Sequence, residues 1–408
     1  MTNPARSERT ILALVGAVQF INILDFMIVM PLGPDFALAL DIPLHDVPKI
    51  GGAYTAAGAV AGLAGSFFLD RFDRRSALVV CLVGLFAGTA SAIFATGLNS
   101  LLLARVFAGL FGGPASSIAM SIVADVVPPE RRGRAMGAIM GMFGAASVFG
   151  VPASVELASH FGWRSPFIAV ALLGLAISVF VMFAMPPMRA HLDARAADYR
   201  ATPVWHLLRD PLVIVSYSIT LLLMMTNFAI VPILSAYLQF NLGYPRDGLS
   251  LLYLCGGSVS IIGMRMIGRQ VDRHGAATVS ALATACLLVV MWLWFVSYSA
   301  AIPVLALFMA YMFTTSLRGV AYQTATSKVP RLEERAGYMS LQSCVSHLAA
   351  TFGSVGASFV LIERPDGSLA GMDTLAYCAM LGAAAVPAIL WHLERRLAAR
   401  ATASLASG

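Results

Sequence analysis

The feature that most constrains the fold is a series of long apolar runs along the whole chain. An apolar stretch of about 20 residues is long enough to cross a bilayer as an α-helix. The 408 residues are 59% hydrophobic and only 12% charged, whereas soluble domains carry about 25% charged residues. Twelve runs predict an all-α membrane protein with twelve transmembrane helices, at about 11–33, 49–69, 76–97, 99–124, 135–158, 165–187, 211–239, 248–268, 276–298, 302–327, 337–362 and 371–393.

The distribution of basic residues predicts the orientation of these helices. With the N-terminus inside, 20 of the 27 Lys and Arg residues fall in cytoplasmic segments, four fall outside and three, Arg105, Arg265 and Arg318, fall within runs. Such an excess on the cytoplasmic side is the usual determinant of membrane topology. The net charge of +6 therefore indicates orientation, and we expect no nucleic-acid partner.

The two halves of the chain repeat each other at an offset of 202 residues. LDFMIV at 24–29 aligns with TNFAIV at 226–231, and LDRFD at 69–73 aligns with VDRHG at 271–275. Six runs per half give both halves the same orientation, as in parallel repeats related by an axis along the membrane normal. The sequence predicts two pseudo-symmetric six-helix bundles, 1–187 and 211–408, joined by a polar cytoplasmic linker at 188–210.

Two short connections, 66–75 and 268–275, each place Asp before Arg at a predicted cytoplasmic helix junction. An ion pair there can favour one conformation, although the charges alone could also serve only topology. The connections resemble the signature loop G-x-x-x-D-R-x-G-R of the major facilitator superfamily. The second copy fits, and the first has Ser66 and Asp73 at the glycine positions; the predicted lock residues are Asp70, Arg71, Arg74, Gly268, Asp272 and Arg273.

Two further motifs extend this resemblance to the drug:proton antiporter-like branch of the superfamily. Arg105 in the run 99–124 matches an arginine that the family carries in its fourth helix. The run 135–158 contains Gly144, Gly150 and Pro152, which partly match the antiporter motif of the fifth helix. Glycine allows close helix approach and proline removes a backbone hydrogen bond, so we expect a hinge here. The resemblance implies a secondary transporter with twelve helices.

Asp25 is a carboxylate within the apolar run 11–33. Helical rise places both Asp25 and Arg105 about 9 Å from the outer edge of the hydrocarbon core, so the two charges can pair. One interpretation is a permanent structural bridge. The other is a proton-coupling site, since ionisable residues inside a membrane are functional candidates and the contact could change between conformations. Asp35 is a competing acid, and His347 is a possible second proton site.

A central substrate cavity is predicted from polar residues at helical spacing in four equivalent runs. In the family, the first, fourth, seventh and tenth helices line the cavity, and interhelical hydrogen bonding is the simpler alternative for the Thr and Tyr members. The predicted cavity residues are Gln19, Asn22, Phe26, Thr220, Met224, Asn227, Tyr311, Thr314, Thr315, Arg318 and Tyr322.

These features together predict a proton-coupled secondary transporter that exports small amphiphilic compounds by alternating access. The alternative is an organic-anion or sugar transporter of the same fold, which Arg105 and Arg318 would suit. We expect no enzyme activity and no cofactor or metal, because the sequence lacks a nucleoside-triphosphate loop of the form G-x-x-x-x-G-K-[ST] and a clustered catalytic site. The expected partners are a small-molecule substrate, protons and the lipid bilayer of the inner membrane, with the protein acting as a monomer.

The topology predicts that both termini and the linker 188–210 lie in the cytoplasm, and fusions in the linker and near the C-terminus test it. Reporter fusions placed after Ala190 and after Leu397 should both read as cytoplasmic, because the basic residues concentrate on that side. Two reporter enzymes measure this, one that is active only in the cytoplasm and one that is active only outside it. An outside signal at either position would contradict the twelve-helix topology.

Overall fold

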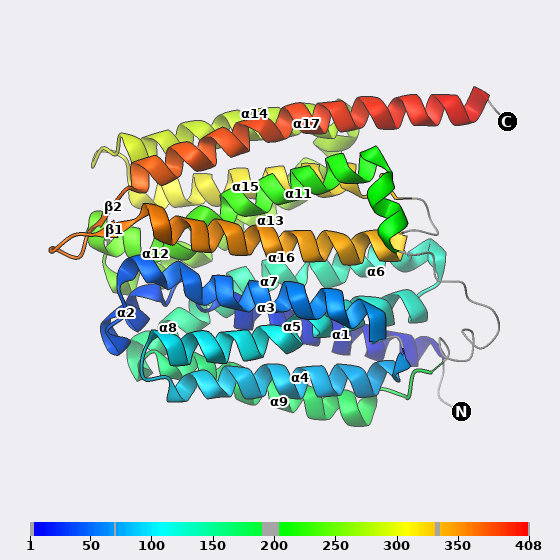
Figure 1. The fold of residues 1–408 in the computed structure, drawn as a ribbon, viewed down its shortest axis with the longest axis horizontal. Helices are drawn as coiled ribbons and strands as arrows, with labels where there is room; N and C mark the ends of the chain where they lie inside the picture. Colours follow the sequence, from blue (N-terminus) through cyan, green and yellow to red (C-terminus); the bar gives the residue numbers. More distant parts are fainter. Residues whose placement is uncertain (1–3, 69–70, 190–203, 331–334, 407–408) are drawn as a thin grey trace. The chain divides into compact units, whose positions relative to one another are not determined.

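A computed structural model describes residues 4–68, 71–189, 204–330 and 335–406. The chain is helical over most of its length (Figure 1) and divides into two compact units, Met1–Ala201 and Thr202–Gly408. The border falls within the segment 188–210, most of which lies outside the described residues. Each unit has its own core.

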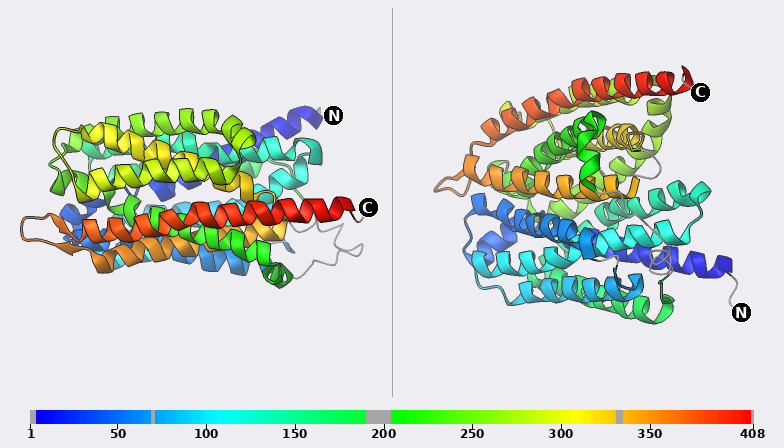
Figure 2. Two further views of the ribbon diagram at one scale, coloured as in Figure 1. Left: turned by 90° about the horizontal axis from the view of Figure 1, so that it is seen from above. Right: turned by 45° about the vertical axis from the view of Figure 1, so that its right-hand side comes forward.

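The first unit is built from helices that pack along their lengths. Helix α5 packs between α3 and α4, and α4 also packs against α9. The right-hand view of Figure 2 shows these helices side by side. The elements are α1 (Pro4–Met27), α2 (Gly33–Leu40), a 3₁₀ turn (Leu44–Asp46), α3 (Val47–Phe68), α4 (Arg74–Ser91), a 3₁₀ turn (Ala92–Phe94), α5 (Leu98–Val126), α6 (Pro129–Met140), α7 (Met142–Ala145), a π-helical turn (Ala146–Gly150), α8 (Val151–Phe161) and α9 (Arg164–Ala184).

The second unit repeats this plan and adds a short hairpin. Helix α11 packs against α16 and α17, and α14 packs against α15 and α17. The elements are a 3₁₀ turn (Val204–Arg209), α11 (Pro211–Ile230), a 3₁₀ turn (Val231–Ile233), α12 (Leu234–Ala236), a π-helical turn (Tyr237–Asn241), a 3₁₀ turn (Arg246–Gly248), α13 (Leu249–His274), α14 (Ala276–Met291), a π-helical turn (Trp292–Val296), α15 (Val304–Thr326), α16 (Arg335–Val360), the antiparallel pair β1 (Ile362–Glu363) and β2 (Leu369–Ala370), and α17 (Met372–Ala406).

All twelve predicted runs are helical. Within the described residues, eleven helical segments are long and apolar enough to cross a membrane. The helix of the second run, α3, has 22 residues but is rich in Gly and Ala and falls outside that group. Six helical segments belong to each unit, as the repeat predicts.

Five of the predicted runs are not continuous α-helices, contrary to the sequence prediction. Two of them end in turns: 76–97 in the 3₁₀ turn Ala92–Phe94 and 276–298 in the π-helical turn Trp292–Val296. Helix α1 ends at Met27 and is followed by turns up to Leu32 before α2 begins. Pro31 and Pro34 explain this break, because neither can donate the backbone hydrogen bond that would continue the helix. The run 211–239 changes to a 3₁₀ turn around Pro232 for the same reason, and 135–158 contains a π-helical turn before Pro152.

Close contact between α3 and α5 depends on glycine. A Cβ added at Gly109 would collide with the carbonyl oxygen of Tyr54, and one at Gly113 would lie 2.5 Å from the carbonyl oxygen of Gly58. Small residues are common at such interfaces because hydrocarbon provides no hydrophobic force between helices, so packing must be close. This approach places Tyr54 beside the residues that surround Asp25.

Candidate functional site

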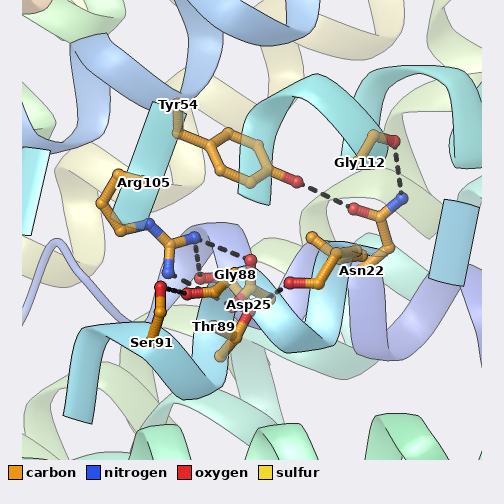
Figure 3. Close-up of polar contacts among 9 residues, drawn as sticks. Asn22, Asp25, Tyr54, Gly88, Thr89, Ser91, Arg105 and Gly112 are labelled. Carbon is orange, nitrogen blue, oxygen red and sulfur yellow. Dashed lines mark hydrogen bonds and ion pairs between the residues drawn. The ribbon is translucent and has the colours of Figure 1, made fainter. Parts of the chain in front are cut away.

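The centre of the candidate site is an ion pair between Asp25 of α1 and Arg105 of α5. The Arg105 Nη2 atom lies 2.7 Å from Asp25 Oδ2, and both side chains have no exposed surface. Arg105 Nη1 donates a second bond of 3.3 Å to Asp25 Oδ1, so the contact is bidentate (Figure 3). Two-point pairing of this kind combines strong attraction with fixed geometry. The pairing that helical depth predicts is therefore present in the structure.

The end of α1 adds to the attraction for Arg105. Asp25 lies two residues before the last residue of the helix, Met27, where backbone carbonyl groups lack intrahelical partners. Arg105 Nη2 reaches one of them, the carbonyl oxygen of Asp25, at 3.5 Å. The C-terminal end of a helix carries partial negative charge and favours a cation. The C-terminal end of α1 thus stabilises the same guanidinium group that the Asp25 carboxylate binds.

Thr89 of α4 is a third member of the site. Its hydroxyl donates to Asp25 Oδ1 at 2.7 Å and lies 3.0 Å from the carbonyl oxygen of Leu85. A hydroxyl is both donor and acceptor. It can donate to an ionised Asp25, or it can donate to Leu85 and accept from a protonated Asp25. Thr89 can therefore bond to Asp25 in either protonation state.

Two aromatic rings and an amide enclose the pair. The Arg105 guanidinium carbon lies 5.0 Å from the centroid of the Tyr54 ring and 5.9 Å from that of Phe167, within the range of cation–π attraction. The Tyr54 hydroxyl donates to Asn22 Oδ1 at 3.0 Å, and Asn22 Nδ2 donates to the carbonyl oxygen of Gly112 at 3.1 Å, as Figure 3 shows. A Cβ at Gly112 would collide with the Tyr54 hydroxyl.

The remaining predicted cavity residues of the first unit lie on the same faces of α1 and α5. Gln19 exchanges hydrogen bonds with Ser116 at 3.2 and 3.3 Å, one turn along from the Asn22 contact. Phe26 packs against Tyr54 with ring centroids 5.4 Å apart. Gln19 and Phe26 are half-buried, whereas Asn22 is buried. The polar face that the spacing predicts is thus an interhelical network in this structure.

The predicted hinge packs directly against the end of α1. A Cβ at Gly150 would lie 2.6 Å from Leu24 Cδ1, and the Ser147 hydroxyl lies 3.7 Å from the sulfur of Met27. The π-helical turn Ala146–Gly150 precedes Pro152, whose ring would collide with the carbonyl group four residues earlier in a regular α-helix. Gly144 is buried just before this turn. A change in this turn would reach the residues on both sides of Asp25.

In the loop 66–75 of the first unit, which is predicted to act as a conformational lock, Asp73 contacts both α4 and the segment that follows α9. It caps α4 through the Ser76 N–H at 3.0 Å, accepts the Met188 N–H at 2.9 Å and pairs with Arg189 at 3.4 Å. Partial burial acts to raise the pKa of Asp73, but the N–H donors and Arg189 outweigh it and hold the pKa below its usual value. Asp73 therefore joins α4 to the segment that follows α9.

The other lock residues of the first unit divide into three cases. Asp70 lies outside the described residues, and Arg71 is exposed. Arg74 is buried and pairs with Asp125 of α5 at 3.3 Å. The sequence prediction thus places one of its lock residues, Arg74, in an ion pair within this unit.

The second unit joins equivalent helices with a different residue. The offset of 202 aligns Asp73 with Gly275, which has a φ of +84° and no carboxylate. Glu394 of α17 takes the place of Asp73: its two oxygens accept the N–H groups of Ala276 at 2.7 Å and Ala277 at 3.0 Å. Arg273 is exposed, Gly268 lies within α13, and the side chain of Asp272 lies outside the described part. Sequence reasoning missed Glu394, because it is far from the loop in the chain.

Two of the predicted cavity residues of the second unit, Thr220 and Tyr322, belong to a tyrosine-centred network. The Tyr322 hydroxyl lies 2.7 Å from Thr220 Oγ1 and accepts from Gln342 Nε2 at 2.5 Å. Thr314 and Thr315 instead donate to carbonyl groups of the preceding turn of α15. Tyr311 and Arg318 are buried, and Met224 and Asn227 are half-buried.

His347, the possible second proton site, lies on α16. Its Nδ1 atom lies 2.9 Å from the carbonyl oxygen of Ser343, and no salt bridge involves it within the described residues. Its role in proton coupling stays a prediction.

A double-mutant series distinguishes a structural bridge from a coupling site. Asp25→Asn or Arg105→Met alone should lower the apparent melting temperature in detergent, since an unpaired buried charge costs about 3–5 kcal/mol. The double variant should recover stability. If the pair only holds helices together, transport driven by a pH gradient should recover with it; if Asp25 carries the proton, stability recovers and driven transport does not. Full additivity of the two stability losses would contradict the pairing itself.

Comparison with known proteins identifies the fold. The family model described as Major Facilitator Superfamily matches residues 15–354. A D-xylose–proton symporter of known structure superposes with a TM-score of 0.72 at 14% identity, covering 95% of this chain and 98% of that one. An inward-facing, occupied bacterial homologue of the human lysosomal transporter Spinster gives 0.75 at 15% identity, covering 97% and 98%. The predicted fold, two six-helix bundles of the major facilitator type, is confirmed.

A relative by sequence is a chloramphenicol resistance protein from Streptomyces lividans. It is 28% identical over 257 residues, which are 63% of this chain and 65% of the relative, so the match spans somewhat less than two thirds of the relative's length. A resistance protein fits the drug:proton antiporter-like branch that the motifs indicate. The chain is a multi-pass membrane transporter rather than an enzyme, and it belongs to the Major Facilitator Superfamily.

Proposed function

We propose that this transporter exports small amphiphilic compounds in exchange for protons. The observation that carries the proposal is the carboxylate–guanidinium pair of Asp25 and Arg105, which has no exposed surface in a membrane-spanning bundle. An ionisable group is rare and costly at this depth and commonly marks a proton path. The similarity to a chloramphenicol resistance protein supports an outward direction and an amphiphilic substrate.

The proposed coupling follows from the alternatives that the site offers to a proton. In the paired state Arg105 balances the charge of Asp25, and Thr89 donates to the carboxylate. Protonation of Asp25 removes the charge that holds Arg105, while Thr89 can still bond to the neutral acid through its second arrangement. If one state of the transport cycle separates the pair, Asp25 takes up a proton there and releases it when the pair forms again.

The available energy is sufficient for efflux. One charge crossing a potential of 100 mV is worth about 2.3 kcal/mol, and about 1.36 kcal/mol corresponds to a factor of ten in concentration. One proton can therefore hold a roughly fifty-fold gradient of an exported compound by these two values. Transport needs no nucleoside triphosphate on this account.

The proposed architecture for this cycle is that of the sequence prediction. The bundles 1–187 and 211–408 are the two moving parts, joined by the cytoplasmic linker 188–210, in a monomer of the inner membrane with both termini in the cytoplasm. The contacts of Asp73 and Glu394 support a role for the cytoplasmic helix ends in setting which state is favoured. The π-helical turn beside Leu24 supports a hinge role for Gly144, Gly150 and Pro152.

An organic-anion carrier of the same fold is a second candidate. Arg318 favours it, because this buried cation has no carboxylate partner within the described residues. A carrier of this kind could use the same proton site, so the two candidates differ in substrate rather than in coupling.

Transport by Asp25→Asn tests the proposal. In vesicles that take up chloramphenicol against its gradient when a pH gradient is imposed, the variant should lose uphill transport and retain downhill exchange. The reason is that Asn keeps the size and polarity of the side chain but cannot exchange a proton. Asp35→Asn, at the start of α2, is the matched control and should retain uphill transport. Uphill transport by Asp25→Asn at the rate of the wild type would contradict the proposal.

A further inference from the structure

Arg74, Arg105 and Arg318 are the buried arginines among the described residues. Arg74 and Arg105 each pair with an acid, and the surroundings of Arg318 differ. It lies within α15 (Val304–Thr326) and is 4% exposed. Arg105 has a carboxylate at 2.7 Å, whereas Arg318 has no acidic partner within 4 Å among the residues that the structure describes. Among the described residues its guanidinium makes one hydrogen bond, from Nη2 to the carbonyl oxygen of Ala383 on α17, which is 3.4 Å long, and its Nε atom has no partner there.

The acidic residues of the second unit cannot easily supply the missing charge. Those whose side chains are described lie at helix ends or in connecting segments, or cap another helix: Asp210, Asp247, Glu363, Asp366, Asp373 and Glu394. Arg318 lies eight residues before the end of α15 at Thr326, which is about 12 Å along a helix. A buried cation without a counter-charge costs several kcal/mol, so its position calls for a compensating group.

The neighbouring polar groups along α15 are already satisfied. Thr314 and Thr315, on the turn before Arg318, donate to carbonyl groups of their own helix. Tyr322, on the turn after, is bonded by Thr220 and Gln342. None of these bonds involves the guanidinium. Apart from the Nη2 bond to Ala383, the donors of Arg318 are therefore available to a group that does not belong to these helices.

The adjacent helix also carries buried polar groups without partners in the described part of the chain. Helix α14 packs against both α15 and α17, and its buried Ser280 and Thr284 hydroxyls lack a partner within the described residues. Thr284 lies eight residues after the start of α14 at Ala276, which is again about 12 Å. Since α14 and α15 are consecutive antiparallel spans, the start of α14 and the end of α15 are at the same side. Buried polar groups without partners indicate a missing water, ion or ligand.

We infer that Arg318 of α15, beside Ala383 of α17, binds an anionic group, namely the carboxylate of an amphiphilic transported compound. A guanidinium has five donors in a planar fork that fits a carboxylate at two points. The inference rests on the proposed function, since it specifies the compounds that the transporter carries.

Binding to the purified full-length protein in detergent tests this inference without any proton gradient. The probes are 4-phenylbutyrate, its neutral amide 4-phenylbutyramide, and sodium chloride at the same ionic strength. The carboxylate should raise the melting temperature of the wild type and the amide should not. Loss of a hydrogen-bonded charge should weaken carboxylate binding about 10- to 100-fold in Arg318→Gln, and Arg318→Lys should be intermediate because it keeps the charge without the fork.

Arg265→Gln is the matched control, because Arg265 is a cation of a membrane-spanning helix in the same unit but is exposed. It should bind 4-phenylbutyrate like the wild type. An Arg318-dependent shift with chloride alone would show that the anion at this site is inorganic and overturn the assignment to a transported carboxylate. Equal shifts with carboxylate and amide, or an unchanged affinity in Arg318→Gln, would overturn the site itself. If Arg318→Gln does not fold, the comparison of the two organic probes on the wild type still decides the inference.

These outcomes are separate from those for proton coupling. If Asp25→Asn keeps uphill transport, the binding result can still be interpreted, because binding is measured in detergent at a single pH and without a proton gradient. A failure of carboxylate binding would in turn leave a proton-coupled exporter of neutral compounds intact.

Discussion

A carboxylate and a guanidinium without exposed surface, inside a bundle of apolar helices, are stable only while they remain together. The Asp25–Arg105 pair therefore constrains everything near it. Helix α1 has to end early so that its terminal carbonyl groups face Arg105, and α3 and α5 have to approach closely so that Tyr54 covers the guanidinium. The glycines at 109 and 112 allow that approach. Any conformation that separates the two charges has to supply a proton, water or another ion in their place.

The fold was largely predictable from the sequence, and so was the pair at its centre. Apolar runs, basic residues on one side and the repeat at 202 residues give the number and order of helices, because these follow from bilayer thickness and backbone hydrogen bonding. Helical rise gives the depth of Asp25 and Arg105. The breaks at Pro31 and Pro232 could also have been anticipated, since proline ends a regular helix wherever no neighbour compensates.

The rotation of each helix about its axis was not predictable, and the missed residues follow from this. Thr89 and Tyr54 are ordinary polar residues in apolar runs. Only the packing of α3 and α4 against α5 turns Thr89 towards Asp25 and Tyr54 towards Asn22. Asp73 stands at a glycine position of the family's loop, and only the structure shows that it forms the cap of α4 and the Met188 contact. Glu394 compensates for the glycine at 275 from a helix more than a hundred residues later. The roles of these residues in transport stay proposals.

The central claim is that Asp25 exchanges the coupling proton, and proton release on substrate binding tests it most directly. Chloramphenicol is added to the detergent-solubilised protein in weakly buffered solution, and an indicator dye records the change in pH. The wild type should release protons in proportion to the compound bound, and Asp25→Asn should bind the compound without releasing any. Equal release from the two proteins would contradict the account, and the coupling site would then lie elsewhere in the chain.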